Sequence, residues 1–193
     1  MIHDAQYDYY GKKLATCSSD GTISIFDVSK GDLSKGDNVV RLSSFKAHNG
    51  PIWQLAWAHP KYGNVIASCG FDRKVIVWKE VKVNDWQEVT SHEHQGSVNA
   101  ICWAPWECGL KLLACSADGT ISLLSRRPDD SWDKPLSIQA HDMGVNCVSW
   151  ASVNSGNDYF AEDYNDKYAP LPRIATGSCD KSIKIWEFRD KDQ

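Results

Sequence analysis

The sequence lacks the features that mark several large classes of protein. No apolar run approaches the roughly 20 residues that a membrane-spanning helix needs, and the first residues lack the basic and then apolar layout of a secretory signal. Basic residues are not in excess, since 21 Lys and Arg face 25 Asp and Glu. Nucleic acid is therefore not expected as a direct partner. We expect a protein on the cytosolic side of any membrane that it serves.

Two more absences bear on the fold. The seven cysteines are odd in number and none stands in Cys-x-x-Cys spacing, which argues against a disulfide framework. Cys17, Cys69 and Cys115 each precede an aspartate by three residues, and this shared position indicates a small apolar side chain in a buried strand. No segment has a sustained helical period between helix caps. The sequence thus predicts reduced core thiols, with no metal or other cofactor.

The sequence does contain a strand–turn–strand stretch in four copies. Alternating and β-branched apolar residues beside each turn predict strands, and two of the turns carry the Asp-Gly pair that suits a tight hairpin. The copies read LATCSSDGTISIF, IASCGFDRKVIVW, LLACSADGTISLL and IATGSCDKSIKIW. The sequence therefore predicts an all-β chain.

A histidine and a strand that ends in tryptophan precede three of the four turns. The tryptophans are Trp57, Trp103 and Trp150, and Tyr7 takes this place in the first copy, where we expect it in the core. The histidine stands 24 residues before the turn aspartate in the second and third copies and 39 residues before it in the fourth (His48 to Asp72, His94 to Asp118, His141 to Asp180). The additional residues of the fourth copy fall in SVNSGNDYFAEDYNDKYAPLP, which predicts an exposed loop.

Strands that recur with a period of roughly 40 to 45 residues and end in tryptophan are typical of β-propeller blades. We therefore expect one partial β-propeller over residues 1–193, with units at approximately 1–43, 44–89, 90–138 and 139–189. Trp86, Trp106 and Trp132 lie outside the recurring strands, and we expect each to pack on an outer strand because tryptophan buries a large area.

The layout of histidine, aspartate and tryptophan resembles that of the WD-repeat proteins. In that family the histidine, a strand Ser or Thr, the turn Asp and the strand Trp form a hydrogen-bonded network inside each blade, and the resemblance implies the same here. By position, two repeats hold the complete set, namely His48, Ser68, Asp72 and Trp78 in the second and His141, Thr176, Asp180 and Trp186 in the fourth.

The first and third repeats depart from that pattern. The third keeps His94 and Asp118 but has Ala114 and Leu124 at the other two places, so we expect its network to be incomplete. The first repeat has Thr16 and Asp20, with Phe26 in place of the tryptophan and no histidine upstream.

Longer phrases, above all WAHPKYG and WKEV, resemble one subfamily, the Sec-thirteen type of propeller. This resemblance implies a non-catalytic scaffold subunit of the COPII vesicle coat in ER-to-Golgi transport and of the nuclear pore complex. Members have six blades in an open ring that a partner chain completes. The implied partner is a large outer-coat subunit or a helical scaffold nucleoporin. The implied locations are the cytoplasm, ER exit sites and vesicle coats, and the nuclear pore.

Six blades would need about 250 residues, more than this chain has. We therefore expect a fragment of an open six-bladed ring, with a closed four-bladed ring as the alternative. An open ring exposes strand edges, to which a partner can add strands of its own. Tyr9 and Tyr10, near the edge of the first unit, are our candidates for partner contacts because aromatic side chains dominate interface energetics.

Other functions are weighed against the scaffold. A Ser-His-Asp hydrolase is disfavoured because these residues recur in successive repeats, whereas a catalytic triad occurs once. A metal site on His92, His94 and Cys102 or Cys108 is disfavoured because His94 already belongs to the repeat. Two further alternatives are non-catalytic, namely a generic WD-repeat adaptor that reads peptides and the sister small-propeller nucleoporin.

Overall fold

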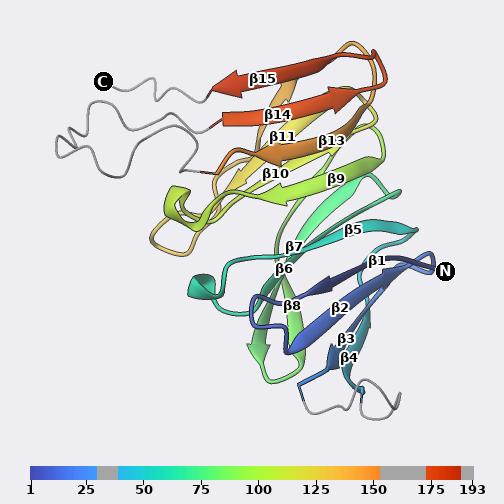
Figure 1. The fold of residues 1–193 in the computed structure, drawn as a ribbon, viewed down its shortest axis with the longest axis vertical. Helices are drawn as coiled ribbons and strands as arrows, with labels where there is room; N and C mark the ends of the chain where they lie inside the picture. The colour runs from blue at the N-terminus through green and yellow to red at the C-terminus, as the bar shows by residue number, and fades with distance from the viewer. Residues whose placement is uncertain (30–38, 153–172, 188–193) are drawn as a thin grey trace.

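The computed structural model describes residues 1–29, 39–152 and 173–187 (Figure 1). Over these ranges the chain is almost entirely β, as the sequence predicts, and the only helices are two single 3-10 turns, η2 (Pro60–Tyr62) and η3 (Trp106–Cys108). No helix in the described ranges is long and apolar enough to span a bilayer. The predicted loop of the fourth repeat falls almost wholly within 153–172, outside the described residues.

The strands form four antiparallel sheets, and in each sheet the strands pair in chain order. The first sheet holds β1 (Ile2–Tyr7), β2 (Lys13–Ser18), β3 (Thr22–Asp27) and β4 (Val40–Lys46). The second holds β5 (Ile52–Trp57), β6 (Val65–Gly70), β7 (Lys74–Lys82) and β8 (Asp85–Glu93). The third holds β9 (Val98–Trp103), β10 (Lys111–Ser116), β11 (Thr120–Ser125) and β12 (Leu136–Gln139). The fourth holds β13 (Val145–Trp150), β14 (Arg173–Ser178) and β15 (Ile183–Glu187).

Each sheet is one blade, and the blades are stacked in chain order. The first strands of successive blades contact one another, β1 with β5, β5 with β9 and β9 with β13. Figure 1 shows the first and fourth blades at opposite ends of this stack. The described chain is therefore an open, partial propeller, and the closed four-bladed alternative is wrong.

Three apolar clusters fill the spaces between consecutive blades. The two middle blades are covered on both faces, which is why every residue of β6 is buried. Cys17, Cys69 and Cys115 are buried in these clusters, as expected, and burial raises the pKa of the Cys17 and Cys115 thiols to about 12. The cluster between the first and second blades includes Ile25 and Leu55. The next, between the second and third blades, includes Val77 and Leu112, and the last, between the third and fourth, includes Ile121 and Ile174.

Two expectations about aromatic residues are wrong. Tyr7 is 56% exposed and does not lie in the core. Its counterparts Trp57 and Trp103 pack on the preceding blade, whereas the described chain has no blade before β1. Trp106 lies in η3 and is exposed, whereas Trp86 of β8 is buried between the first two blades, as expected. The indole N–H of Trp86 has no hydrogen-bond partner among the described residues.

Candidate functional site

The second blade contains a buried chain of hydrogen bonds. His48 precedes β5, Ser68 lies on β6, Asp72 is in the turn that follows and Trp78 is on β7. His48 Nδ1 lies 2.8 Å from Asp72 Oδ1, and His48 Nε2 lies 2.8 Å from Ser68 Oγ. The Trp78 indole N–H donates to Ser68 Oγ over 2.9 Å. The structure thus brings together all four residues of this predicted set.

Electrostatics explain why these polar groups are tolerated inside the blade. Burial lowers the pKa of His48 below its ordinary value, so the imidazole is neutral near pH 7. Burial would raise the pKa of Asp72, but hydrogen bonds from His48 and from the Asn49 and Lys74 backbone N–H groups outweigh it and lower that pKa. An ionised acceptor, a neutral imidazole, a hydroxyl and an indole donor therefore satisfy one another.

The hydrogen-bond distances among Ser68, His48 and Asp72 match those of a Ser-His-Asp hydrolytic triad, yet Ser68 is unsuited to nucleophilic attack. Ser68 is 0% exposed, and its oxygen already accepts a hydrogen bond from Trp78. A substrate carbonyl has to come within about 3–3.5 Å of the nucleophile, and a fully buried hydroxyl leaves no space for it. The network is therefore a structural element of the blade.

The fourth blade repeats the arrangement. His141 Nδ1 lies 2.8 Å from Asp180 Oδ2, and His141 Nε2 lies 2.8 Å from Thr176 Oγ1. The Trp186 indole N–H donates to Thr176 Oγ1 over 3.1 Å. Ser182 adds a hydroxyl that donates to Asp180 Oδ1 over 2.6 Å, and this bond is the main reason that the pKa of Asp180 is lowered.

The third blade departs from the expectation drawn from Ala114. Its His94 Nε2 lies 2.8 Å from Ser122 Oγ on β11, the residue directly opposite Ala114 in the sheet. The hydroxyl that bonds to the imidazole is therefore on the third strand of this blade, whereas in the second and fourth blades it is on the second strand. The other ring nitrogen lies 2.9 Å from Thr120 Oγ1, which donates to Asp118 Oδ1 over 2.6 Å. Asp118 thus meets His94 mainly through Thr120, because the direct separation from Nδ1 to Oδ2 is 3.7 Å.

The first blade has a reduced version without a histidine. Asp20 accepts hydrogen bonds from the hydroxyls of Ser18 and Thr22, and these bonds lower its pKa to about 2. Lys46 donates to the backbone carbonyl of Asp20. The turn is therefore ordered by local side chains. Asp20 is exposed, so it does not need an imidazole partner to compensate for burial.

A second set of hydrogen bonds links the blades to one another. The indole N–H groups of Trp57, Trp103 and Trp150 donate to the carbonyls of Gln6, Ala56 and Cys102, in each case on the first strand of the preceding blade. Asp4 and Gln54 add side-chain acceptors for the backbone N–H groups of Leu55 and Ile101, one blade further on. The tryptophan bonds recur at all three junctions and the side-chain acceptors at the first two, and together they set how one blade meets the next.

The two end blades expose faces that the middle blades bury. On the fourth blade, Ile183 and Ile185 of β15 are 78% and 73% exposed. On the first blade, Ile2 and Tyr7 of β1 are more than half exposed. These two faces are the principal apolar surfaces at the ends of the stack, and apolar surface rimmed by strand edges is typical of an interaction site.

Tyr9 and Tyr10, the predicted partner-facing residues, lie in the turn between β1 and β2 and are exposed. The ring of Tyr9 packs edge-on against Tyr10 at a centroid distance of 5.2 Å and against His59 at the same distance. His59 in turn stacks on Trp106 at 5.5 Å. The result is an exposed aromatic row that runs across the first three blades.

His92 and His94, the histidines of the disfavoured metal site, are both engaged in other contacts. His94 is engaged by Ser122 and Thr120, and His92 Nε2 lies 3.1 Å from Ser137 Oγ. No group of three or more His, Cys, Asp or Glu side chains among residues 1–29, 39–152 and 173–187 has the arrangement of a metal site.

Comparison with known proteins places this geometry in a wider group. The WD domain, G-beta repeat family matches residues 2–27, 39–79, 86–124 and 132–187. The chain is 42% identical to the Drosophila melanogaster "Protein SEC13 homolog", over all of this chain and 52% of that protein. It is 43% identical to the Cryptococcus neoformans "Protein transport protein SEC13", over all of this chain and 60% of that protein. A Mycosarcoma maydis protein of the same name is 37% identical, over 97% of this chain and 59% of that protein. The chain thus spans little more than half the length of these relatives.

Proposed function

The chain belongs to the WD40-repeat family and its repeats are of the Sec13 type, and from this membership we propose that it is a scaffold subunit in protein transport. Two of the relatives are named as protein transport proteins. The family and these names indicate a structural, non-enzymatic role. The buried blade networks support the same conclusion, because their histidines and hydroxyls are consumed by internal hydrogen bonds.

The observation that carries the proposal is the open end of the stack at the first blade. Among the described residues β1 is an edge strand, as the first strand of every blade is. Ile2 and Tyr7 offer exposed apolar side chains there, whereas the counterparts of Ile2 in the later blades are buried and those of Tyr7 are partly buried against the preceding blade. A partner that adds a strand or a blade there would gain backbone hydrogen bonds along the edge and apolar contact on the face. Tyr9 and Tyr10 lie beside this edge and would extend the contact.

We assign the partner to a protein that donates a blade. The Sec13-type resemblance makes the large outer-coat subunit of the ER-to-Golgi vesicle coat the first choice and a helical scaffold nucleoporin the second. In this role the chain is a peripheral component that reaches a membrane only through its complex, at ER exit sites, on vesicle coats or at the nuclear pore. This role requires no cofactor and no small-molecule substrate.

Co-expression with each partner tests the proposal. We expect a stoichiometric complex in size-exclusion chromatography with the outer-coat subunit, and we expect the double variant Ile2→Arg, Tyr7→Arg to lose it. The matched control is Val83→Arg, since Val83 is 88% exposed on the hairpin between β7 and β8, away from the end of the stack. The additional variant Tyr9→Ala, Tyr10→Ala is expected to weaken the complex about tenfold.

Two results would reject the scaffold assignment. One is that the chain is folded, as its β-type circular dichroism spectrum would show, and yet binds neither partner. The other is a complex that Val83→Arg disrupts as strongly as the end-face variant. Binding to the nucleoporin alone would keep the scaffold role and transfer it from the coat to the pore.

A further inference from the structure

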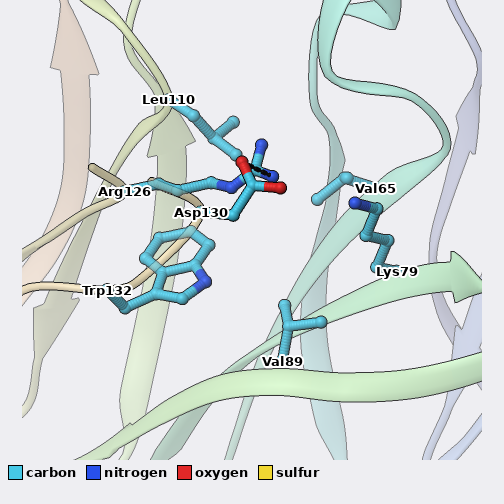
Figure 2. Close-up of a pocket in the computed structure, with 7 residues that line it drawn as sticks. All are labelled: Val65, Lys79, Val89, Leu110, Arg126, Asp130 and Trp132. Carbon is cyan, nitrogen blue, oxygen red and sulfur yellow. Dashed lines mark ion pairs between the residues drawn. The ribbon is translucent and has the colours of Figure 1, made fainter. Parts of the chain in front are cut away.

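A cavity of about 250 Å³ lies between the second and third blades, away from both ends of the stack (Figure 2). Its walls come from two blades. Val65, Lys79 and Val89 lie on β6, β7 and β8 of the second blade. The other side is formed by Leu110, before β10, and by the segment that follows β11, with Arg126, Asp130 and Trp132. The blade networks and the end faces do not account for this cavity.

The inner part of the cavity is apolar. Val65 and Leu110 are almost completely buried, and Val89 and Trp132 are half-buried and pack on the same cluster between the blades. In Figure 2 the Trp132 ring and Val89 border one side of the space and Leu110 borders another. A volume of this size accommodates one large aliphatic or aromatic side chain, and it is smaller than the ~300 Å³ lower bound for small-molecule sites.

The opening of the cavity carries a net positive charge. Lys79 and Arg126 approach it from opposite blades, and in Figure 2 the side chains of both residues reach toward its centre. Arg126 is paired with Asp130, the one acidic lining residue. Two cations and one anion leave one positive charge, in a chain whose overall net charge is −4.

The two partners of the Arg126–Asp130 ion pair differ in exposure, which would allow another carboxylate to replace that of Asp130. The Arg126 side chain is 16% exposed, whereas that of Asp130 is 71% exposed. Asp130 itself has φ 69° and lies in a surface turn. An exposed carboxylate contributes little to an ion pair because water screens it. A carboxylate from a ligand could therefore replace Asp130 on Arg126 and meet Lys79 at the same time.

We propose that this cavity binds a short acidic segment of another protein, with an apolar side chain between the blades and a neighbouring carboxylate between Lys79 and Arg126. The apolar walls select the side chain, and the two cations select the charge beside it. The site is independent of the end faces and gives the scaffold a second contact. Because one side chain fills it, a single segment is expected to bind weakly, with Kd of about 1 mM.

Nuclear magnetic resonance of the tryptophan indole N–H groups of the full chain tests the proposal. The probe is the peptide acetyl-Asp-Leu-Asp-amide, compared with acetyl-Asn-Leu-Asn-amide, which lacks the charge, and acetyl-Asp-Ser-Asp-amide, which lacks the apolar side chain. We expect the first peptide to shift the Trp132 signal, which is assigned with Trp132→Phe, and the other two to bind at least fivefold more weakly.

Variants with opposite expected effects complete the test. Lys79→Ala is expected to weaken binding about fivefold, while Lys82→Ala, an equal charge change at the exposed end of the same strand, leaves it unchanged. Asp130→Asn is expected to strengthen binding about threefold because it frees Arg126, and asparagine tolerates the left-handed backbone at this position.

Three outcomes would overturn the proposal. The neutral peptide binding as well as the acidic one would remove the charge recognition. Asp130→Asn weakening the interaction would show that Asp130 supports the cavity and does not compete with a ligand. Equal losses in Lys79→Ala and Lys82→Ala would indicate a general attraction of acidic peptides. None of these measurements depends on the end-face partner, so failure here leaves the proposed scaffold function intact.

Discussion

His94 shows how single residues of the blades are tuned. Its side chain is 1% exposed and is placed between Thr120 and Ser122. Burial, together with the nearby charge of His92, lowers the pKa of His94 to about 4. The neutral imidazole can accept at one nitrogen and donate at the other, which both hydroxyls require, whereas the protonated ring has no acceptor. The blade therefore disfavours the charged form.

The depressed pKa predicts a stability that depends on pH. An unfolded histidine titrates near 6.5, so the unfolded chain takes up this proton first as the pH falls. The stabilisation is complete above pH 6.5 and is lost between about pH 6.5 and 4, with a limit of about 3 kcal/mol. Urea unfolding at pH 7.5 and pH 5 measures it. His94→Gln, which does not titrate, should lose at least 1 kcal/mol less stability between the two conditions, and equal losses would contradict the assignment.

At the scale of elements, the turn between β10 and β11 is a junction as well as a reversal of the chain. Gly119 has φ 85°, and its carbonyl accepts hydrogen bonds from the backbone N–H groups of Ala140 and His141 at the start of the fourth repeat. A β-carbon at Gly119 would lie 2.5 Å from the His141 carbonyl oxygen. Glycine is thus needed for the backbone conformation and for the close approach of the next repeat.

Substitution by alanine separates these two requirements. Gly63 also has a positive φ, 82°, but nothing lies within 4 Å of a β-carbon placed there. Gly63→Ala should therefore cost only the backbone strain, about 1 kcal/mol, whereas Gly119→Ala should cost at least about 3 kcal/mol because it also separates two repeats. Urea unfolding of both variants checks the difference, and similar losses would show that the contact at Gly119 is unimportant.

For the whole molecule, the packing of blade on blade determines which apolar residues are covered. Ile183 pairs with Gly177 on the fourth blade in the same register in which Val75 pairs with Cys69 on the second. Val75 is 0% exposed because the third blade covers it. Ile183 has the same place in its own sheet but lies on the uncovered face at the end of the stack.

This face should make the chain self-associate. Exposed apolar surface beside a strand edge favours contact between copies, so sedimentation velocity should show association that rises with protein concentration. The double variant Ile183→Lys, Ile185→Lys should remain monomeric, with a change in unfolding free energy of less than about 0.5 kcal/mol because both side chains are exposed. Unchanged association in this variant would place the contact elsewhere, and a large loss of stability would show that the face is covered in solution.

The sequence by itself determined the strands, the turns, the number of repeats and the propeller class. Those features depend on local chemistry, such as the Asp-Gly turns at Asp20 and Asp118 and the alternation of β-branched residues, which acts over a few positions of the chain. The resemblance to the WD repeat, carried over by position, implied the sets of residues that the structure brings together around His48 and His141.

Only the tertiary structure decided the rest. Ser122 bonds to His94 because it lies opposite Ala114 on the neighbouring strand, and Tyr7 is exposed because no blade of the described chain covers β1. The cavity beside Trp132 exists because a segment of the third blade approaches the second. Each of these depends on which sheet, strand or loop is the neighbour in space, and a pattern confined to one stretch of sequence does not contain that information.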